Sequence, residues 1–314
     1  MMDILFVADP LAGFKVYKDS TYAMMAEAVR RGHGIHACEP ADLVWRGGKV
    51  LGSTRRIGLT GRSPDWFSAA ESEWRPLAGF DAVLMRKDPP FDESYLNTTY
   101  LLEMAERDGA RVFNRPRALR DYNEKLAIGR FPRFTVPTLV TCLAGEIRAF
   151  LAEHGDIVVK PLNAMGGSGI FRLRTDDPNL GAILETVTGL GSRQVMAQRY
   201  IPEIADGDKR ILLIDGEPVP YSLARIPAPG ETRGNLAAGG TGVARPLTER
   251  DREIAAALGP QLKDEGLLLV GLDVIGDWLT EVNVTSPTCF REITDQTGCD
   301  VAALFLDALE RQCA

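Results

Sequence analysis

The sequence is poor in histidine and lacks paired cysteines. Its three histidines, His33, His36 and His154, lie apart from the polar clusters of the chain. Because imidazole is the commonest general base and a frequent metal ligand, this scarcity argues against imidazole-based hydrolysis and against a histidine-rich metal site. The five cysteines are an odd number without a CxxC pair, so we expect reduced structural thiols instead of a disulfide framework.

Long apolar runs and an excess of positive charge are also missing. No run approaches the length that spans a bilayer, and the first residues lack the cationic stretch of a signal peptide. We therefore expect a cytoplasmic protein without a membrane partner. Acidic residues outnumber basic ones, 43 to 36, and the net charge of -7 repels nucleic acid, so we expect no nucleic-acid partner.

The first third of the chain alternates strand-like and helix-like segments. The pattern predicts strands at residues 3–8, 35–38, 81–85 and 111–113, helices at 21–31 and up to 108, and a hairpin across 43–51. Such alternation is typical of an α/β domain with a mainly parallel sheet that is covered by helices.

The pattern changes after Leu126. Prolines at positions 132 and 137 interrupt a connector, and most of the remaining chain is predicted to form strands joined by glycine turns. One long helix is expected at residues 248–265, with Thr248 as its N-cap, and a last helix at 300–311. We therefore predict a domain boundary near Tyr122.

A glycine-rich segment comes after a lysine at the end of an apolar strand. Lys160 closes the strand at residues 156–161, and the sequence Met165-Gly166-Gly167-Ser168-Gly169 leads directly into another strand. A Walker loop would open a helix, which this segment does not do. The alternatives are a hairpin flap whose bare backbone approaches phosphates above Lys160, and a loop that only turns the chain.

A second lysine, Lys125, comes after residues with the spacing of a capping box. Asp121 and Glu124 stand three positions apart, which predicts that Lys125 lies in a first helical turn with its side chain free to reach outward. Alone it is an ordinary surface lysine. Together with Lys160 it would grip the phosphates of a nucleotide from the other side.

Three oxygen-bearing side chains interrupt two apolar strands near the C-terminus. A three-residue loop at 276–278 would place Asp273 opposite Glu281, with Asn283 on the same face, whereas a strict two-residue turn would separate the carboxylates. Carboxylates that converge on an apolar sheet repel one another unless a hard cation joins them, and magnesium is the natural candidate. The alternative is a solvent-facing polar stripe on an edge hairpin.

An extended segment at residues 195–202 comes after the glycine-rich region. Its backbone could bond the edge of an adenine while Ile201 and Met196 cover the ring faces, or the segment is a plain connector. Asp208 lies in a nearby glycine turn, where it either reaches a ribose or phosphate-bound water or only forms the turn.

Three arginines occupy the next strands and the loop after them. Arg210, Arg225 and Arg233 suit carboxylates or phosphates because the guanidinium group donates parallel hydrogen bonds, although single arginines more often form salt bridges. The loop at residues 227–242 contains five glycines, and we expect it to be a mobile lid that excludes water.

These features occur in the order found in the ATP-grasp ligases. Four segments resemble the bacterial glutathione synthetases more closely, and the resemblance runs from the first strand to the last helix. The segments are Leu84 to Asp92, Asn123 to Leu126, Glu231 to Gly240 and Glu281 to Thr288.

The resemblance implies an ATP-grasp fold with three units. These would be an N-terminal Rossmann-like substrate domain at 1–122, a small lid domain at 123–200, and a mainly antiparallel catalytic domain at 201–314 with a mobile loop at 227–242. It also implies that ATP activates γ-glutamylcysteine as an acyl phosphate, which glycine then attacks to give glutathione. Magnesium, or manganese in its place, would be the metal, and family members are often tetramers.

The resemblance further implies roles for individual residues. Nucleotide would be held by Lys125, Lys160, Met165, Gly166, Gly167, Gln198, Tyr200, Ile201 and Asp208, metal by Asp273, Glu281 and Asn283, and substrate or acyl phosphate by Arg86, Arg210, Arg225, Arg233 and Ser286. The flap has a glycine where some relatives carry a larger residue. Two rival assignments remain at this point: another ATP-grasp ligase, such as a D-alanine-D-alanine or peptide-tailing enzyme, and a nucleotide-binding module without turnover.

Overall fold

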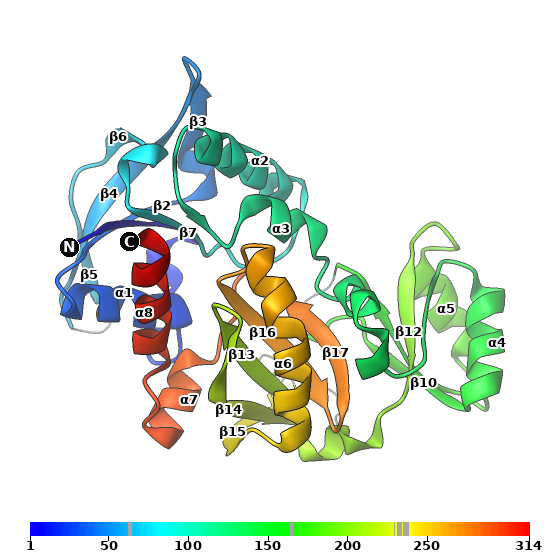
Figure 1. Ribbon diagram of the computed structural model, residues 1–314. Helices are drawn as coiled ribbons and strands as arrows, with labels where there is room; N and C mark the ends of the chain where they lie inside the picture. The colour runs from blue at the N-terminus through cyan, green and yellow to red at the C-terminus, as the bar shows by residue number, and fades with distance from the viewer. Residues whose placement is uncertain (62–64, 164–165, 229, 231–233, 235–238) are drawn as a thin grey trace.

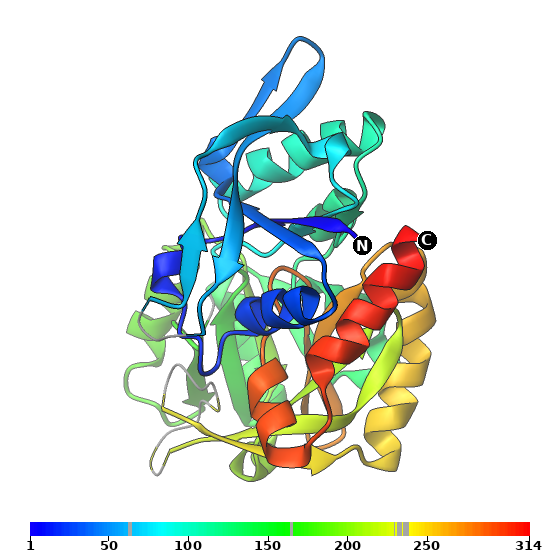
Figure 2. The ribbon, with the colours of Figure 1, turned by 90° about the vertical axis from the view of Figure 1, so that its left-hand side faces the viewer.

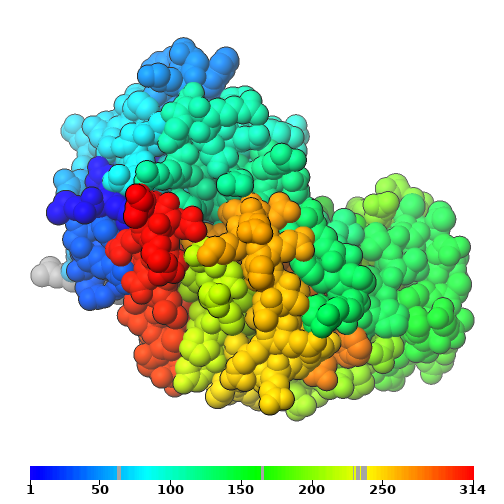
Figure 3. Space-filling model, viewed as in Figure 1, coloured from blue at the N-terminus to red at the C-terminus, as the bar shows by residue number. Residues whose placement is uncertain are grey.

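The computed structural model describes residues 1–61, 65–163, 166–228, 230, 234 and 239–314. Met165, Arg233 and half of the predicted loop at 227–242 lie outside the described residues. Three sheets succeed one another along the chain, and the second of them stands out from the rest of the molecule (Figures 1 and 3). Among the described residues, every helix is too short or too polar to cross a membrane.

The first sheet has the predicted parallel centre. Strands β2, β1, β7 and β8 pair in parallel, and β4 adds an antiparallel edge that carries β3, β5 and β6. Apart from Asp3 in β1 and His36 in β2, the central strands are apolar because helices and the third unit cover both faces. The elements are β1 (Asp3–Val7), α1 (Ser20–Arg30), β2 (Gly34–Cys38), β3 (Leu43–Arg46), β4 (Lys49–Leu59), β5 (Phe67–Ala69), β6 (Glu73–Pro76), β7 (Ala82–Met85), α2 (Glu93–Arg107), β8 (Val112–Phe113) and α3 (Pro116–Asp121).

Helix α1 begins where a side chain can cap it. The Asp19 carboxylate accepts a hydrogen bond from the Tyr22 amide at 2.7 Å, and Gly32 leaves the helix with a φ of +81°. Asp19 is therefore the N-cap of α1. This start fixes the first turn of α1 near the ends of β1 and β7, where ligand sites of parallel sheets lie.

The middle sheet is antiparallel in the order β11-β10-β12-β9. Two helices cover one of its faces, with Ile147 and Leu184 packed against Ile157. The prediction that this region is mostly strands and glycine turns is wrong, because the apolar residues of both helices recur at helical spacing and bury this face. The elements are β9 (Thr138–Thr141), α4 (Ala144–His154), β10 (Asp156–Pro161), β11 (Phe171–Arg174), α5 (Leu180–Thr188) and β12 (Val195–Arg199).

The third sheet is antiparallel in the order β15-β14-β13-β16-β17. The two predicted helices are confirmed as α6 and α8, and Thr248 forms a capping box with Asp251 at the start of α6. The elements are β13 (Asp208–Ile214), β14 (Glu217–Ile226), β15 (Thr241–Pro246), α6 (Glu249–Asp264), β16 (Leu269–Ile275), β17 (Trp278–Asn283), α7 (Phe290–Thr297) and α8 (Val301–Cys313).

The first and third sheets are joined by buried contacts. Helix α8 packs beside α1 (Figure 2), and Phe6, Leu212 and Leu309 share one apolar cluster. The buried Asn114 amide donates to the carbonyls of Leu269 and Val284 at 2.7 and 2.8 Å. Since these contacts pair polar groups that are buried between the two sheets, they hold the end of β17 at a fixed position beside the parallel sheet.

Candidate active site

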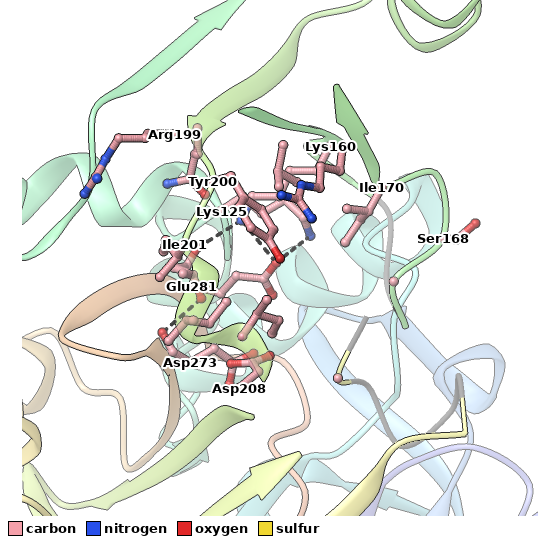
Figure 4. A pocket seen from close by; sticks show the side chains of 18 of the residues that line it. Lys125, Lys160, Ser168, Ile170, Arg199, Tyr200, Ile201, Asp208, Asp273 and Glu281 are labelled. Atoms are coloured by element: carbon pink, nitrogen blue, oxygen red, sulfur yellow. Dashed lines mark hydrogen bonds and ion pairs between the residues drawn. The ribbon is translucent and has the colours of Figure 1, made fainter. Parts of the chain in front are cut away.

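A pocket opens between the middle sheet and the third sheet. Its empty volume is about 940 Å3, and both lysines and the acidic residues of the β16–β17 hairpin lie in its walls. Figure 4 shows Lys125 and Lys160 gathered there with Asp273 and Glu281. Polar clusters that are far apart in the sequence therefore meet at one cavity.

The β16–β17 hairpin presents the expected metal ligands on one face. Asp273 lies directly opposite Glu281, as predicted, and Asn283 comes two positions after Glu281. Only 3% of the Asp273 surface is exposed, so the interpretation of this hairpin as a solvent-facing polar stripe is wrong. The oxygens instead belong to the wall of the pocket.

The predicted three-residue loop of this hairpin is wrong. Ile275 pairs with Trp278 across a two-residue turn at 276–277. A β-bulge at Thr280 supplies the extra residue, which returns Glu281 to the face of Asp273. The Thr280 hydroxyl donates to the Asp273 carbonyl at 3.1 Å and helps to hold the bulge. The predicted pairing of Asp273 with Glu281 is thus correct, but it results from the bulge and not from the predicted loop length.

The local structure around Lys125 differs from the predicted capping box. The Asn123 side chain, instead of Asp121, accepts hydrogen bonds from the amides of Lys125 and Leu126, and a 3-10 helix begins at Leu126. The Glu124 carboxylate turns the other way, toward the segment after β17. Lys125 itself is only 5% exposed, so it is not an ordinary surface lysine.

Both lysines face the same carboxylate. The Nζ atoms of Lys125 and Lys160 lie 3.4 and 3.6 Å from Glu281 Oε1, and Lys160 also donates to the Thr280 carbonyl at 3.2 Å. Burial lowers the pKa of the Lys160 ammonium, an effect that Glu281 opposes and Lys125 strengthens. Two buried ammonium groups with one carboxylate between them form a strong attractor for an added anion.

Two arginines hold Asp273 in place. Arg210 donates to both Asp273 oxygens, at 2.5 and 3.0 Å, and Arg225 lies 2.8 Å from one of them while also pairing with Asp208. Burial alone would raise the pKa of Asp273, but the two guanidinium groups outweigh it and hold the pKa well below its usual range. Asp273 is therefore ionised and available as an oxygen ligand.

Asp208 is less completely neutralised. Its Oδ2 pairs with Arg225, whereas its Oδ1 is enclosed and has no hydrogen-bond partner among the described residues. Burial raises the pKa of Asp208 to about 6, with Arg225 opposing and Asp273 adding to the shift. The residue is thus more than a turn former, and it lines the same pocket as the lysines.

The expected adenine segment forms another wall of the pocket. Gln198, Tyr200 and Ile201 line it, and the Gln198 side-chain amide donates to the Thr138 hydroxyl at 3.0 Å. Gly166 and Gly167 of the flap line the opposite side. The segment is therefore part of the cavity and not a plain connector.

A second pocket adjoins the first and shares Lys125, Asp273 and Glu281 with it. Its walls also include Arg86, Arg210, Asn283 and Ser286. The buried Arg86 donates to the Thr21 hydroxyl at 3.1 Å and to the Pro287 carbonyl at 3.0 Å, and Ser286 donates to Asp88 at 2.5 Å. Arg225 is not among the residues that line this second pocket. It contacts Asp208 and Asp273, and Asp273 lines the pocket.

Sequence reasoning missed several residues of the site. Glu124 accepts hydrogen bonds from the amides of Val284 and Thr285 and from the Thr285 hydroxyl, between 2.8 and 3.2 Å. Lys18 and Glu292 line the second pocket. The position of Glu124 next to Lys125 was a signal for the first of these, whereas nothing in the local pattern marks the other two.

The oxygen donors suit a hard divalent cation. Asp273, Glu281 and Asn283 share one face, and the Asn283 nitrogen donates to the Gly271 carbonyl at 3.2 Å, so its oxygen is the group left for an ion. In the described part of the chain, histidine, cysteine and acidic side chains nowhere form a metal-binding group of three. A metal at this hairpin would therefore need oxygens from a ligand as well.

Comparison with known families agrees with this arrangement. Residues 2–120 match the model of the prokaryotic glutathione synthetase N-terminal domain, and residues 124–298 match the model of the ATP-grasp domain of the same family. The chain belongs to the prokaryotic glutathione synthetase family. The glutathione synthetase of Ralstonia nicotianae is 61% identical to it over 310 residues, which cover 99% of this chain and 96% of that protein.

Two solved structures share the fold of this glutathione synthetase family member. The D-cycloserine synthetase DcsG has a TM-score of 0.70 at 16% identity, over 99% of this chain and 100% of that one. The ATP-grasp ligase PsnB, in complex with a phosphomimetic variant of its minimal precursor, Mg and ADP, has a TM-score of 0.62 at 20% identity, over 100% and 99% of the two chains. At these identities the likeness shows the fold alone, and the predicted ATP-grasp fold is confirmed.

Membership of the glutathione synthetase family also decides between the rival assignments. The chain is an ATP-dependent ligase, which excludes a nucleotide-binding module without turnover. The match of both domain models along the chain favours glutathione synthesis over the D-alanine-D-alanine and peptide-tailing ligases that share the fold.

Proposed function

We propose that this chain joins γ-glutamylcysteine to glycine and converts ATP to ADP and phosphate. The observation that carries the proposal is the convergence of Lys125 and Lys160 on Glu281, at the place where the first pocket opens into the second. A phosphoryl group held there would meet a substrate carboxylate entering from the second pocket. The family and its relatives support the identity of the substrates.

The first pocket suits ATP. Lys125 and Lys160 would hold the phosphates, since both ammonium groups are buried and face one carboxylate, whose place a more highly charged anion would take. The backbone at Gln198 and Tyr200 and the side chain of Ile201 would hold the adenine, and Asp208 would face the sugar or bound water. Gly166 and Gly167 of the flap would cover the phosphates from the opposite wall of the pocket, and Met165 would contribute beside them.

The β16–β17 hairpin suits magnesium, with manganese as an alternative of the same charge. Asp273, Glu281 and Asn283 would hold the ion and nucleotide phosphate would complete its shell. When bound, the ion neutralises negative charge that builds up on the transferred phosphoryl group. A fold neighbour, PsnB, is described with Mg and ADP.

The reaction consists of two displacements. A cysteinyl carboxylate oxygen attacks the γ-phosphorus of ATP and ADP leaves, which gives an acyl phosphate. The amine of glycine then attacks the carbonyl carbon, phosphate leaves with the electrons of the C–O bond, and the amine loses a proton. Neither displacement requires a nucleophile from the chain. Lys125, Lys160 and Arg210 would position the reacting groups and stabilise charge, the main requirement of phosphoryl transfer.

The remaining arginines would serve the dipeptide and the intermediate. Arg86 is fixed by Thr21 and Pro287 beside Ser286, so Arg86 and Ser286 would contact a substrate carboxylate in the second pocket. Arg225 would keep Asp273 ionised and in place. Arg233 and the loop at 227–242 would form a lid that protects the acyl phosphate from water.

The organisation of the chain completes the proposal. We assign the substrate domain to residues 1–122, the lid domain to 123–200 and the catalytic domain to 201–314, and we place the working enzyme in the cytoplasm as a homo-oligomer, with the tetramer as its form. Sedimentation of the purified chain tests the last point. A monomer at micromolar concentration would contradict it.

Phosphate release is the direct test of the proposed function. Purified protein is supplied with MgATP and γ-glutamylcysteine, with and without glycine, and both phosphate and glutathione are measured. We expect sustained release only when both substrates are present, with one glutathione formed per phosphate. Release that continues with D-alanine alone, or ATP binding without any release, would contradict the proposal.

A further inference from the structure

The second displacement of the proposed reaction requires a base. Free glycine carries an ammonium group at neutral pH, and an ammonium nitrogen has no lone pair with which to attack the acyl phosphate. One proton must therefore leave the nitrogen before the attack, and a positioned carboxylate can accept it. This inference rests on the proposed function and concerns the side chain that takes that proton.

A third pocket meets the first two at Lys125. Its empty volume is about 650 Å3, and Lys125 lines all three pockets. The third pocket also shares Pro89, Glu124 and Thr285 with the second. Glu124 therefore lies in a wall that the second and third pockets have in common, one position before a lysine that is expected to hold phosphate.

One oxygen of the Glu124 carboxylate is used within the chain. Its Oε1 accepts hydrogen bonds from the amides of Val284 and Thr285 and from the Thr285 hydroxyl, between 2.8 and 3.2 Å. Its Oε2 accepts none from the residues that the structure describes, and it is not fully enclosed either, so it faces open space. Oε1 thus fixes the carboxylate, while Oε2 keeps the capacity to accept a proton from a ligand.

The other acidic side chains of the second pocket suit this role less well. Asp273 and Glu281 are expected to bind the metal, and they face arginine and lysine side chains. Three further acidic residues line the second pocket and neither of its neighbours, namely Asp19, Asp88 and Glu292. Because the phosphoryl group is expected where the pockets meet, Glu124 is the carboxylate left at that junction among the described residues.

The surroundings of Glu124 favour uptake of a proton. Burial raises the pKa of Glu124, the amide and hydroxyl of Thr285 oppose this shift, and the Glu281 carboxylate adds to it. A general base works best when its pKa lies near the working pH, so a raised pKa is a shift in the useful direction.

We propose that Glu124 is the general base of the second displacement. Its Oε2 accepts a hydrogen bond from the glycine ammonium group and removes one proton, which leaves a lone pair on the nitrogen. The nitrogen attacks the carbonyl carbon of the acyl phosphate, and the departing phosphate takes the electrons of the C–O bond and the second proton of the nitrogen. Glu124 then returns its own proton to water.

Hydroxylamine tests this role because it is largely unprotonated at neutral pH and needs no base. Purified Glu124→Gln is supplied with MgATP, γ-glutamylcysteine and either glycine or hydroxylamine, and glutathione or hydroxamate is measured. We expect kcat with glycine to fall roughly 100-fold or more, while the rate of hydroxamate formation stays within about threefold of the wild type. The glutamine carbonyl oxygen can still accept the three hydrogen bonds from residues 284 and 285.

A second variant and a control complete the experiment. Glu124→Asp keeps a carboxylate but withdraws it by one methylene group, so we expect a smaller loss with glycine and an unchanged rate with hydroxylamine. The control is Asp121→Asn, which neutralises an exposed carboxylate three positions earlier that pairs with Arg117. It should behave as the wild type with both nucleophiles.

The outcomes separate this inference from the proposed function. An unchanged rate with glycine in Glu124→Gln, or an equal loss with glycine and hydroxylamine, would overturn the role of Glu124 while glutathione synthesis by the wild type stands. If Glu124→Gln does not fold, Glu124→Asp decides alone, and its loss must be confined to glycine. If the wild type makes neither glutathione nor hydroxamate, the proposed function fails and this inference fails with it.

Discussion

The β16–β17 hairpin and the second pocket place their functional groups in opposite ways. On the hairpin, Asp273 and Glu281 meet because residues a few positions apart pair across a turn. In the second pocket, Arg86 reaches Thr21 and Pro287, which are 65 and 201 positions away. Local register governs the first arrangement and tertiary packing governs the second.

This difference decides what a sequence can reveal. A strand pattern with period two fixes which side chains share a face, so the acidic pair could be predicted before any coordinates. Packing of α1, the end of β7 and the start of α7 obeys no local period. The hairpin should therefore be sensitive to single insertions and deletions, and the second pocket to the loss of individual side chains.

Deletion of Val282 should have the largest effect. Asn283 would then follow Glu281 directly, so strand alternation would send Asn283 to the opposite face, and the hydrogen bond from the Val282 amide to the Glu124 carbonyl would be lost. We expect no measurable glutathione synthesis and a loss of magnesium-dependent nucleotide binding, measured with a fluorescent ATP analogue.

Deletion of Thr280 is the matched control. It removes the extra residue of the bulge and leaves Asp273 opposite Glu281, with Asn283 on the same face. Nucleotide binding should persist at least in part. If the Val282 deletion binds nucleotide normally, or if the Thr280 deletion abolishes binding although the protein is folded by circular dichroism, register does not govern the site.

Glu281→Gln should have the next largest effect. The change removes the carboxylate that faces Lys125 and Lys160 and that is expected to bind the metal, so kcat should fall by roughly 100-fold or more. Activity is measured against magnesium concentration, and the apparent requirement should rise. The exposed Glu253→Gln on α6 is the control. An unchanged magnesium dependence would refute the metal assignment.

Arg86→Gln tests the second pocket. Loss of the guanidinium group removes a buried tie between Thr21 and Pro287 and a group for the substrate carboxylate. We expect KM for γ-glutamylcysteine to rise roughly tenfold, while the dissociation constant of MgATP stays within about twofold. Arg117→Gln on the exposed side of α3 serves as the control. Equal losses of dipeptide and nucleotide binding would show that Arg86 supports the whole fold instead.

Much of the fold and part of the site could be read from the sequence. The parallel centre of the first sheet, helices α1, α6 and α8, and the pairing of Asp273 with Glu281 agree with periodicity and capping. Helices α4 and α5 were missed because short amphipathic helices between strands look like strand and turn segments in isolation.

The failures at Lys125 and Glu292 have a different cause. Glu124 has capping-box spacing from Asp121, but its carboxylate accepts three hydrogen bonds from residues 284 and 285, and the Asn123 side chain accepts from the Lys125 amide instead. Such competition between a local and a distant partner is invisible in a local pattern. Glu292 shows no local signal either, because its surroundings are made by α1.

Asp208, in the wall of the first pocket, gives the smallest and most specific test. Its pKa in the folded protein is raised to about 6 from an ordinary value of 3.8, so the folded state binds more protons between these values than the unfolded state. The free energy of unfolding of the wild type should therefore fall, relative to that of Asp208→Asn, as the pH rises from 4 to above 6. The change should be about 1 to 3 kcal/mol, measured by urea unfolding without ligands. A difference between the two proteins that stays constant over this range would mean that Arg225 compensates the carboxylate fully, and that Asp208 is as well paired as Asp273.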